Sequence, residues 1–131
     1  MARYVITPDV ALRLAGDRVA VPAGHHLLAP TLLRSQLLSL LYQAVRRGEL
    51  TRKEADRQLD YVRGLRLRLL GDRVLQGLAW RFADQLGWPD TLTAEYVALA
   101  KLQADALVTL DATLARQAAK LVPTAPVDVL L

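Results

Sequence analysis

The sequence predicts an α/β domain whose central sheet is mostly parallel and contains four or five strands. Short β-like runs alternate with helical stretches along the whole chain, and strands separated by helices imply βαβ units. A chain of 131 residues suffices for one domain with one core, so we expect residues 1–131 to form a single domain. Apolar residues make up 53% of the chain and aromatic residues 5%, which predicts an aliphatic core.

Four segments have the apolar runs expected of strands, and a loop-like segment at 19–21 is a candidate edge strand. Pro8 ends the first of these runs. Pro30 ends another, where a proline in the first turn of the following helix is favourable because its missing N–H would be unsatisfied there anyway. The predicted strands are residues 4–7, 19–21, 25–29, 106–109 and 127–130.

Helical periodicity and end signals predict the helices between these strands. Thr51 and Glu54 have the spacing of a capping box. Gly71 and Asp72 are expected to end one helix and cap the next, and Gly87 is a plausible C-terminal cap. The segment between Gly48 and Gly71 is predicted to be a helical hairpin, an excursion from the sheet. The predicted helices are residues 10–14, 31–47, 51–71, 72–86, 94–103 and 112–119.

The chain carries a net charge of +4, from 17 basic and 13 acidic residues, and the excess is localised. Between Arg46 and Arg81 there are ten basic residues and five acidic ones. This pattern is compatible with an anionic partner and with an ordinary solvated helix surface. Arg66 and Arg68, if helical, would lie about 200° apart and could not form one tight patch. The arginines singled out as possible contacts are Arg34, Arg46, Arg47, Arg66 and Arg73.

Other features of the sequence limit the location and the chemistry of the protein. Cysteine is absent, which excludes disulfides and thiolate metal sites and is compatible with an intracellular location. The opening M-A-R-Y-V-I-T-P has no long apolar run, so we expect no signal peptide. The apolar stretches are far shorter than the roughly 18 residues of a membrane span. We therefore expect a cytoplasmic protein without a membrane partner.

Polar residues recur where predicted strands meet helices. Asp9 follows the first strand, Gln36 lies near the start of the helix at 31–47, Thr93 opens the helix at 94–103, and Asp111 follows the strand at 106–109. In a doubly wound sheet these segments can converge on one edge, where ligands and metals usually bind. Each residue also has a structural interpretation. Both aspartates and the threonine suit helix caps, and the glutamine suits a buried hydrogen-bonding position.

The chain resembles the PIN domain, and within it the VapC-like toxins of bacterial toxin–antitoxin pairs, over nearly its whole length. The resemblance is carried by A-E-Y-V-A-L-A at 94–100, by A-L-V-T-L-D-A-T-L-A at 106–115, and by L-A-P-T-L-L-R-S-Q-L-L-S-L-L at 28–41. It implies a three-layer α/β/α domain, a homodimer and a small antitoxin partner. It also implies cleavage of RNA by carboxylates that bind Mg²⁺ or Mn²⁺, since hard cations prefer oxygen ligands. The arginines would then hold RNA or meet an acidic antitoxin segment.

The sequence departs from the family pattern at most of the acidic positions. The family's carboxylates fall on Thr7, Gln36 and Thr93, and Asp111 stands at its expected place. Three negative charges are therefore missing, and Asp9, two residues after the first position, can restore one. The resemblance implies catalytic positions at Asp9, Gln36, Thr93 and Asp111, with the two aspartates as metal ligands.

Three functions are consistent with this pattern. The first is a metal-dependent endoribonuclease with weakened activity. The second is a non-catalytic PIN scaffold that binds RNA or a partner protein. The third is a helical interaction module unrelated to PIN domains, which would require the segments at 4–7 and 106–109 to be helical.

Overall fold

Five parallel strands form one sheet in the order β3-β2-β1-β4-β5. We describe residues 2–131 of a computed structural model of the chain. From β1 the chain winds outward to β2 and β3, then crosses back to β4 and β5, so the winding reverses between β1 and β4. The strands are β1 (Ala2–Ile6), β2 (His25–Pro30), β3 (Leu67–Leu70), β4 (Ala106–Val108) and β5 (Thr124–Ala125).

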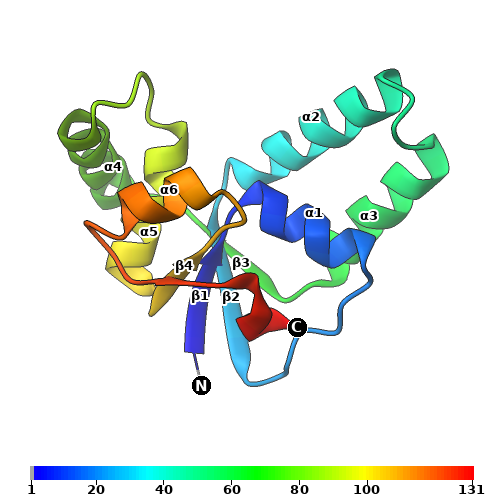
Figure 1. Ribbon diagram of the computed structural model, residues 1–131, viewed down its shortest axis with the longest axis horizontal. Coiled ribbons are helices and arrows are strands. Elements are labelled where there is room, and N and C mark those ends of the chain that lie inside the picture. The colour runs from blue at the N-terminus through cyan, green and yellow to red at the C-terminus, as the bar shows by residue number, and fades with distance from the viewer. Residues whose placement is uncertain (1) are drawn as a thin grey trace.

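Helices cover both faces of this sheet, which confirms the three-layer α/β/α architecture. Figure 1 shows α1, α2 and α3 on one side of the strands and α4 and α5 on the other. The hairpin of α2 and α3 projects from the body of the domain as an arm. The helices are α1 (Pro8–Gly16), α2 (Leu33–Arg46), α3 (Arg52–Gly64), α4 (Arg73–Leu86), α5 (Leu92–Gln103) and α6 (Ala112–Ala118), and a 3₁₀ turn, η1, follows at Val127–Leu130.

Helix α5 is the centre of the core. It packs on β1, β2 and β4 and against α4, and its residues from Tyr96 to Ala100 are all buried. Three alanines among its buried positions let the helix lie close to the strands. The middle of the helix is apolar on every side, as a helix in the interior must be, and its polar residues lie toward its two ends. The strands β1 and β4 beneath it show that the chain is not the purely helical module considered above.

Residues 67–70 form the edge strand β3, so the prediction of one helix from 51 to 71 is wrong. Helix α3 ends at Gly64, and the L-R-L-R-L run that follows alternates with the period of two of a strand. Leu67 and Leu69 face a groove against α2 and α3. The α2–α3 hairpin is an excursion, as predicted, but the chain returns to the sheet before Gly71.

Other predicted strand boundaries also need correction. Residues 19–21 are not a strand; the Val19 carbonyl instead accepts a hydrogen bond from the Tyr61 hydroxyl at 2.6 Å. The last strand is β5, and the residues predicted as strand 127–130 form η1. Pro126 comes between the two, and it has no N–H with which to continue the parallel ladder. Pro30 ends β2, opposite Leu70, and α2 begins later, at Leu33.

The caps predicted at Thr51, Asp72 and Gly87 are confirmed. The Thr51 hydroxyl accepts a hydrogen bond from the Glu54 N–H at 3.1 Å, and the Asp72 carboxylate accepts one from the Leu75 N–H at 2.8 Å. Gly87 follows α4 in the left-handed conformation, with φ of 69°. Within residues 2–131, no helix combines the length and apolar character that crossing a membrane requires.

Candidate functional site

The predicted site lies where the winding of the sheet reverses, at the carboxyl ends of β1 and β4. Thr7 follows β1 and is buried, with 4% of its surface exposed, and Asp9 lies in the first turn of α1. Thr109 and Asp111 follow β4, the neighbour of β1 in the sheet. Open α/β sheets bind ligands at this kind of junction. The topology therefore brings Asp9 and Asp111 to the same edge, as the sequence predicted.

The Asp9 carboxylate connects the two strand ends through hydrogen bonds. Its Oδ1 accepts from the Thr7 hydroxyl and from the Val10 N–H at 2.9 Å. Its Oδ2 accepts from the Leu110 N–H at 3.2 Å and from the Thr109 hydroxyl at 3.5 Å. A carboxylate offers about four lone-pair sites, and these donors, of which the Thr109 hydroxyl is the most distant, engage them. The N-cap position of α1 is Thr7, so Asp9 is not the N-cap; it joins β1 to β4.

Asp111 caps helix α6. Its Oδ1 accepts hydrogen bonds from the Thr113 N–H at 2.9 Å and the Leu114 N–H at 3.1 Å. Its own N–H donates to the Thr109 hydroxyl at 3.2 Å. Thr109 therefore stands between the two aspartates, donating to Asp9 and accepting from Asp111. The capping interpretation of Asp111 is confirmed, and its carboxylate remains exposed to solvent.

Gln36 contacts the core through Tyr96. The buried Tyr96 hydroxyl donates a hydrogen bond to the Gln36 Oε1. The pKa of Tyr96 is raised, first by burial and then by the negative charges of Glu95 and Asp9. Burial likewise raises the pKa of Glu95. Tyr96 on α5 is therefore hydrogen-bonded to Gln36 on α2, and the charge of Asp9 on α1 contributes to its raised pKa.

Thr93 lies at the exposed end of α5 and faces α6. It occupies the first turn of the helix, whose N-cap position is Thr91, so the prediction that Thr93 caps α5 is wrong. Thr93 and Asp111 line one surface pocket of about 240 Å³, together with Trp88 and Asp90. The Asp90 carboxylate accepts a hydrogen bond from the Leu92 N–H at 3.0 Å, so it is turned toward the helix start.

Sequence reasoning missed two residues that hold this site together, Tyr96 and Thr109. Tyr96 is the only aromatic residue on α5, and it lies on the helix that forms the centre of the core. A tyrosine in such a helix needs a partner for its hydroxyl, and this was the available signal. Thr109 gave no signal beyond its place directly after a buried strand.

The donor set at this edge does not fit Mg²⁺ or Mn²⁺. In the part of the chain that the structure describes, no three His, Cys, Asp or Glu side chains are grouped so as to hold a metal. Hard divalent cations take several oxygen ligands with carboxylates among them. Asp9 already accepts from four donors, and one oxygen of Asp111 accepts two backbone N–H groups. A cation at Asp9 would have to displace some of these donors, and Asp111 would offer it one carboxylate oxygen.

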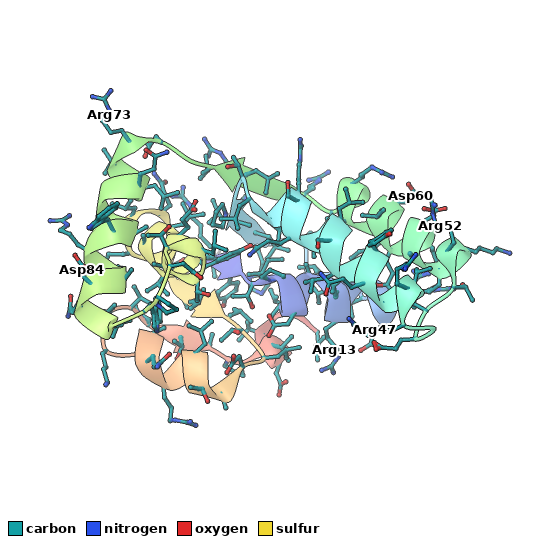
Figure 2. All side chains as sticks on the ribbon, turned by 90° about the horizontal axis from the view of Figure 1, so that it is seen from above. Arg13, Arg47, Arg52, Asp60, Arg73 and Asp84 are labelled. Atoms are coloured by element: carbon teal, nitrogen blue, oxygen red, sulfur yellow. The ribbon has the colours of Figure 1, made fainter. Side chains whose placement is uncertain are left out.

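The arginines predicted to contact RNA or a partner do not form one surface. Arg47 lies just after α2, at the tip of the arm, and Arg73 lies at the start of α4; Figure 2 shows them at opposite ends of the molecule. Arg47 also forms an ion pair with Glu49, at 2.8 Å. Arg46 is at the same tip of the arm, and Arg34 lines the groove between α2, α3 and β3.

Comparisons with known proteins support the fold. No protein-family model matches the sequence, and no curated protein matches it. Among solved structures, the crystal structure of PAE2754 from Pyrobaculum aerophilum is similar, with a TM-score of 0.73 and 20% sequence identity. The match covers 97% of this chain and 90% of that chain. At this identity the similarity shows a shared fold over nearly the whole length.

Proposed function

We propose that this chain is a PIN-like domain that binds RNA and lacks the metal-dependent cleavage of that family. The observation that carries the proposal is the hydrogen-bonded Asp9 carboxylate. A metal ligand must offer free lone pairs, whereas this carboxylate joins β1 to β4 through four donors. The net charge of +4 supports an anionic partner. The homodimer and the antitoxin partner stay predictions from the resemblance, and the cytoplasmic location stays a prediction from the sequence.

The experiment is a calorimetric Mn²⁺ titration combined with an RNA cleavage assay. We expect no saturable Mn²⁺ binding and no Mn²⁺-dependent cleavage by the wild-type protein, and RNA binding that EDTA does not change. Asp111→Asn is the matched control variant, because asparagine still caps α6 but carries no charge. Mn²⁺-dependent cleavage by the wild-type protein that Asp111→Asn abolishes would overturn the proposal and support a weakened endoribonuclease.

A second variant tests whether the alignment with the family is right. Thr7→Asp, Gln36→Glu and Thr93→Asp together restore the three missing carboxylates. The new carboxylate at position 7 would lie against Asp9, whose Oδ1 contacts the present Thr7 hydroxyl. Like charges this close repel, so we expect the triple variant to be less stable than wild type without metal. Mn²⁺ should then raise its thermal midpoint, because a ligand that binds the folded state stabilises it. No rise would mean that the three positions do not converge.

A further inference from the structure

A pocket lined by arginines lies near the amino ends of β1 and β2, at the edge of the sheet away from Asp9 and Asp111. Its volume is about 210 Å³, and we refer to it as the arginine pocket. Arg3 comes from β1, Arg68 from β3, and Arg66 from the residue just before β3. The remaining lining residues are His26, Leu27, Leu28 and Gln103.

The strand register places Arg3 and Arg68 on one face of the sheet. Arg3 is paired with His26 across β1 and β2, and Arg68 is paired with Leu28 across β2 and β3. His26 and Leu28 are two residues apart on β2, so their side chains point to the same face. Arg66 lies in the turn between α3 and β3, where the Leu67 N–H donates to the Leu65 carbonyl at 2.7 Å, and it lines the same pocket as Arg68. The prediction that Arg66 and Arg68 cannot share one patch is therefore wrong, because the two residues are not in a helix.

The three arginines have no acidic partner among residues 2–131. Every ion pair found there uses another cation, namely Arg13, Arg47, Arg52, Arg57 or Arg63. Arg3, Arg66 and Arg68 are all exposed. The nearby acid Asp105 accepts a hydrogen bond from the Arg3 backbone N–H at 2.8 Å, but it does not line the pocket. Three unneutralised guanidinium groups over one pocket produce a local positive potential.

We propose that the arginine pocket binds successive backbone phosphates of a single RNA strand. Guanidinium groups bind phosphate oxygens in pairs through a planar fork. Residues two apart on a strand have Cα atoms about 7 Å apart, and β3 lies roughly 10 Å from β1 across β2. Exposed arginines whose backbones are spaced over these distances can contact neighbouring phosphates of one chain. The inference deepens the proposed function and rests on it, since it assigns RNA binding to a specific surface.

The test is fluorescence anisotropy of a labelled 12-nucleotide oligouridine with the full chain. Arg66→Gln with Arg68→Gln removes two charges from the pocket. Arg81→Gln with Lys120→Gln is the matched control, because it removes two charges at exposed positions that do not line the pocket. We expect at least about tenfold weaker binding for the pocket variant. Its slope of log affinity against log salt should be less steep by about 1.4, from roughly 0.7 per single-strand phosphate contact. The control should lose less than about threefold through its net charge alone.

The outcomes separate the two proposals. If the pocket variant and the control lose the same RNA affinity, at unchanged thermal midpoints, the arginine pocket is not the binding surface. The proposal that the protein binds RNA would still stand. If the wild-type protein does not bind the oligouridine, both proposals fail. Competition with uridine monophosphate distinguishes a strand from a single phosphate. We expect uridine monophosphate to displace the labelled oligouridine only at a far higher concentration than unlabelled oligouridine does. Displacement at the same concentration would overturn the assignment to a strand.

Discussion

The buried hydroxyl of Tyr96 donates a hydrogen bond to the side-chain oxygen of Gln36, a residue 60 positions earlier in the chain. This contact joins the first turn of α2 to the central helix α5. A carboxylate at position 36 would add a third negative charge near a tyrosine whose pKa is already raised by burial and by Glu95 and Asp9. The neutral amide accepts the same hydrogen bond without that charge.

Replacing Tyr96 with phenylalanine should destabilise the fold. The variant keeps the ring and removes the donor to Gln36 Oε1, so we expect the free energy of unfolding to fall by about 1–2 kcal/mol. Urea unfolding measures this change. Tyr42→Phe is the matched control, since Tyr42 is 63% exposed and its loss should change little. Equal stability of Tyr96→Phe and wild type would show that water replaces the contact at no cost.

Asp111 should stabilise the protein mainly as a helix cap. Asp111→Ala removes the acceptor for the Thr113 and Leu114 N–H groups, so we expect a loss of about 1 kcal/mol. Asp111→Asn keeps a capping oxygen and should lose only a few tenths of a kcal/mol. Thermal unfolding of both variants in EDTA checks that Asp111→Ala is the less stable of the two. If both variants lose the same stability, the carboxylate charge matters more than the cap.

Glu54 should make stability depend on pH in the acid range. Hydrogen bonds from Arg57 and then Gln58 lower its pKa from 4.5 to about 2. The folded state therefore holds a proton on Glu54 less tightly than the unfolded state. The resulting stabilisation is complete above about pH 4.5 and is lost as the pH falls toward 2. The same Arg57 also donates to the Ala15 carbonyl at 2.7 Å, which ties α3 to the end of α1.

The measurement is the urea midpoint of wild type and Glu54→Gln at pH 7 and pH 3. We expect Glu54→Gln to be less stable than wild type at pH 7. The difference in stability should be smaller at pH 3, because protonation of the wild-type carboxylate then removes part of the stabilisation that it provides. Asp56→Asn is the control, as its carboxylate pairs with Arg52 on the exposed surface. A gap of the same size at both pH values would contradict the lowered pKa of Glu54.

Replacing two glycines of the α4 region with alanine should change the stability of the protein in opposite directions. Gly87 has φ of 69°, which strains an L-residue, so Gly87→Ala should cost about 1 kcal/mol. Gly77 lies inside α4, and a Cβ there would meet no atom within 4 Å. Gly77→Ala should therefore stabilise the protein by about 0.5–1 kcal/mol. Thermal midpoints of the two variants test this, and a shift in the same direction for both would refute it.

The sequence by itself determined the fold class, several of the helix caps and the convergence of two aspartates. Thr51, Asp72 and Gly87 act within their own turn of chain, so local chemistry predicts them. Asp9 and Asp111 follow neighbouring strands, and parallel strands present their carboxyl ends at one edge. Leu65 and Leu69 fit a helical stripe and so predict a helix through 67–70, whereas the alternation of leucine and arginine from 65 to 69 fits the strand that forms there.

Only the tertiary structure decided what these residues do. Sequence spacing does not show which donors reach a carboxylate, since the Leu110 N–H and the Thr109 hydroxyl come to Asp9 from the other end of the chain. It does not show that Arg3, Arg66 and Arg68 line one pocket, because that depends on how three strands pair. Hydrogen bonds and charge clusters between distant segments depend on the positions of side chains after packing, and local sequence does not encode those positions.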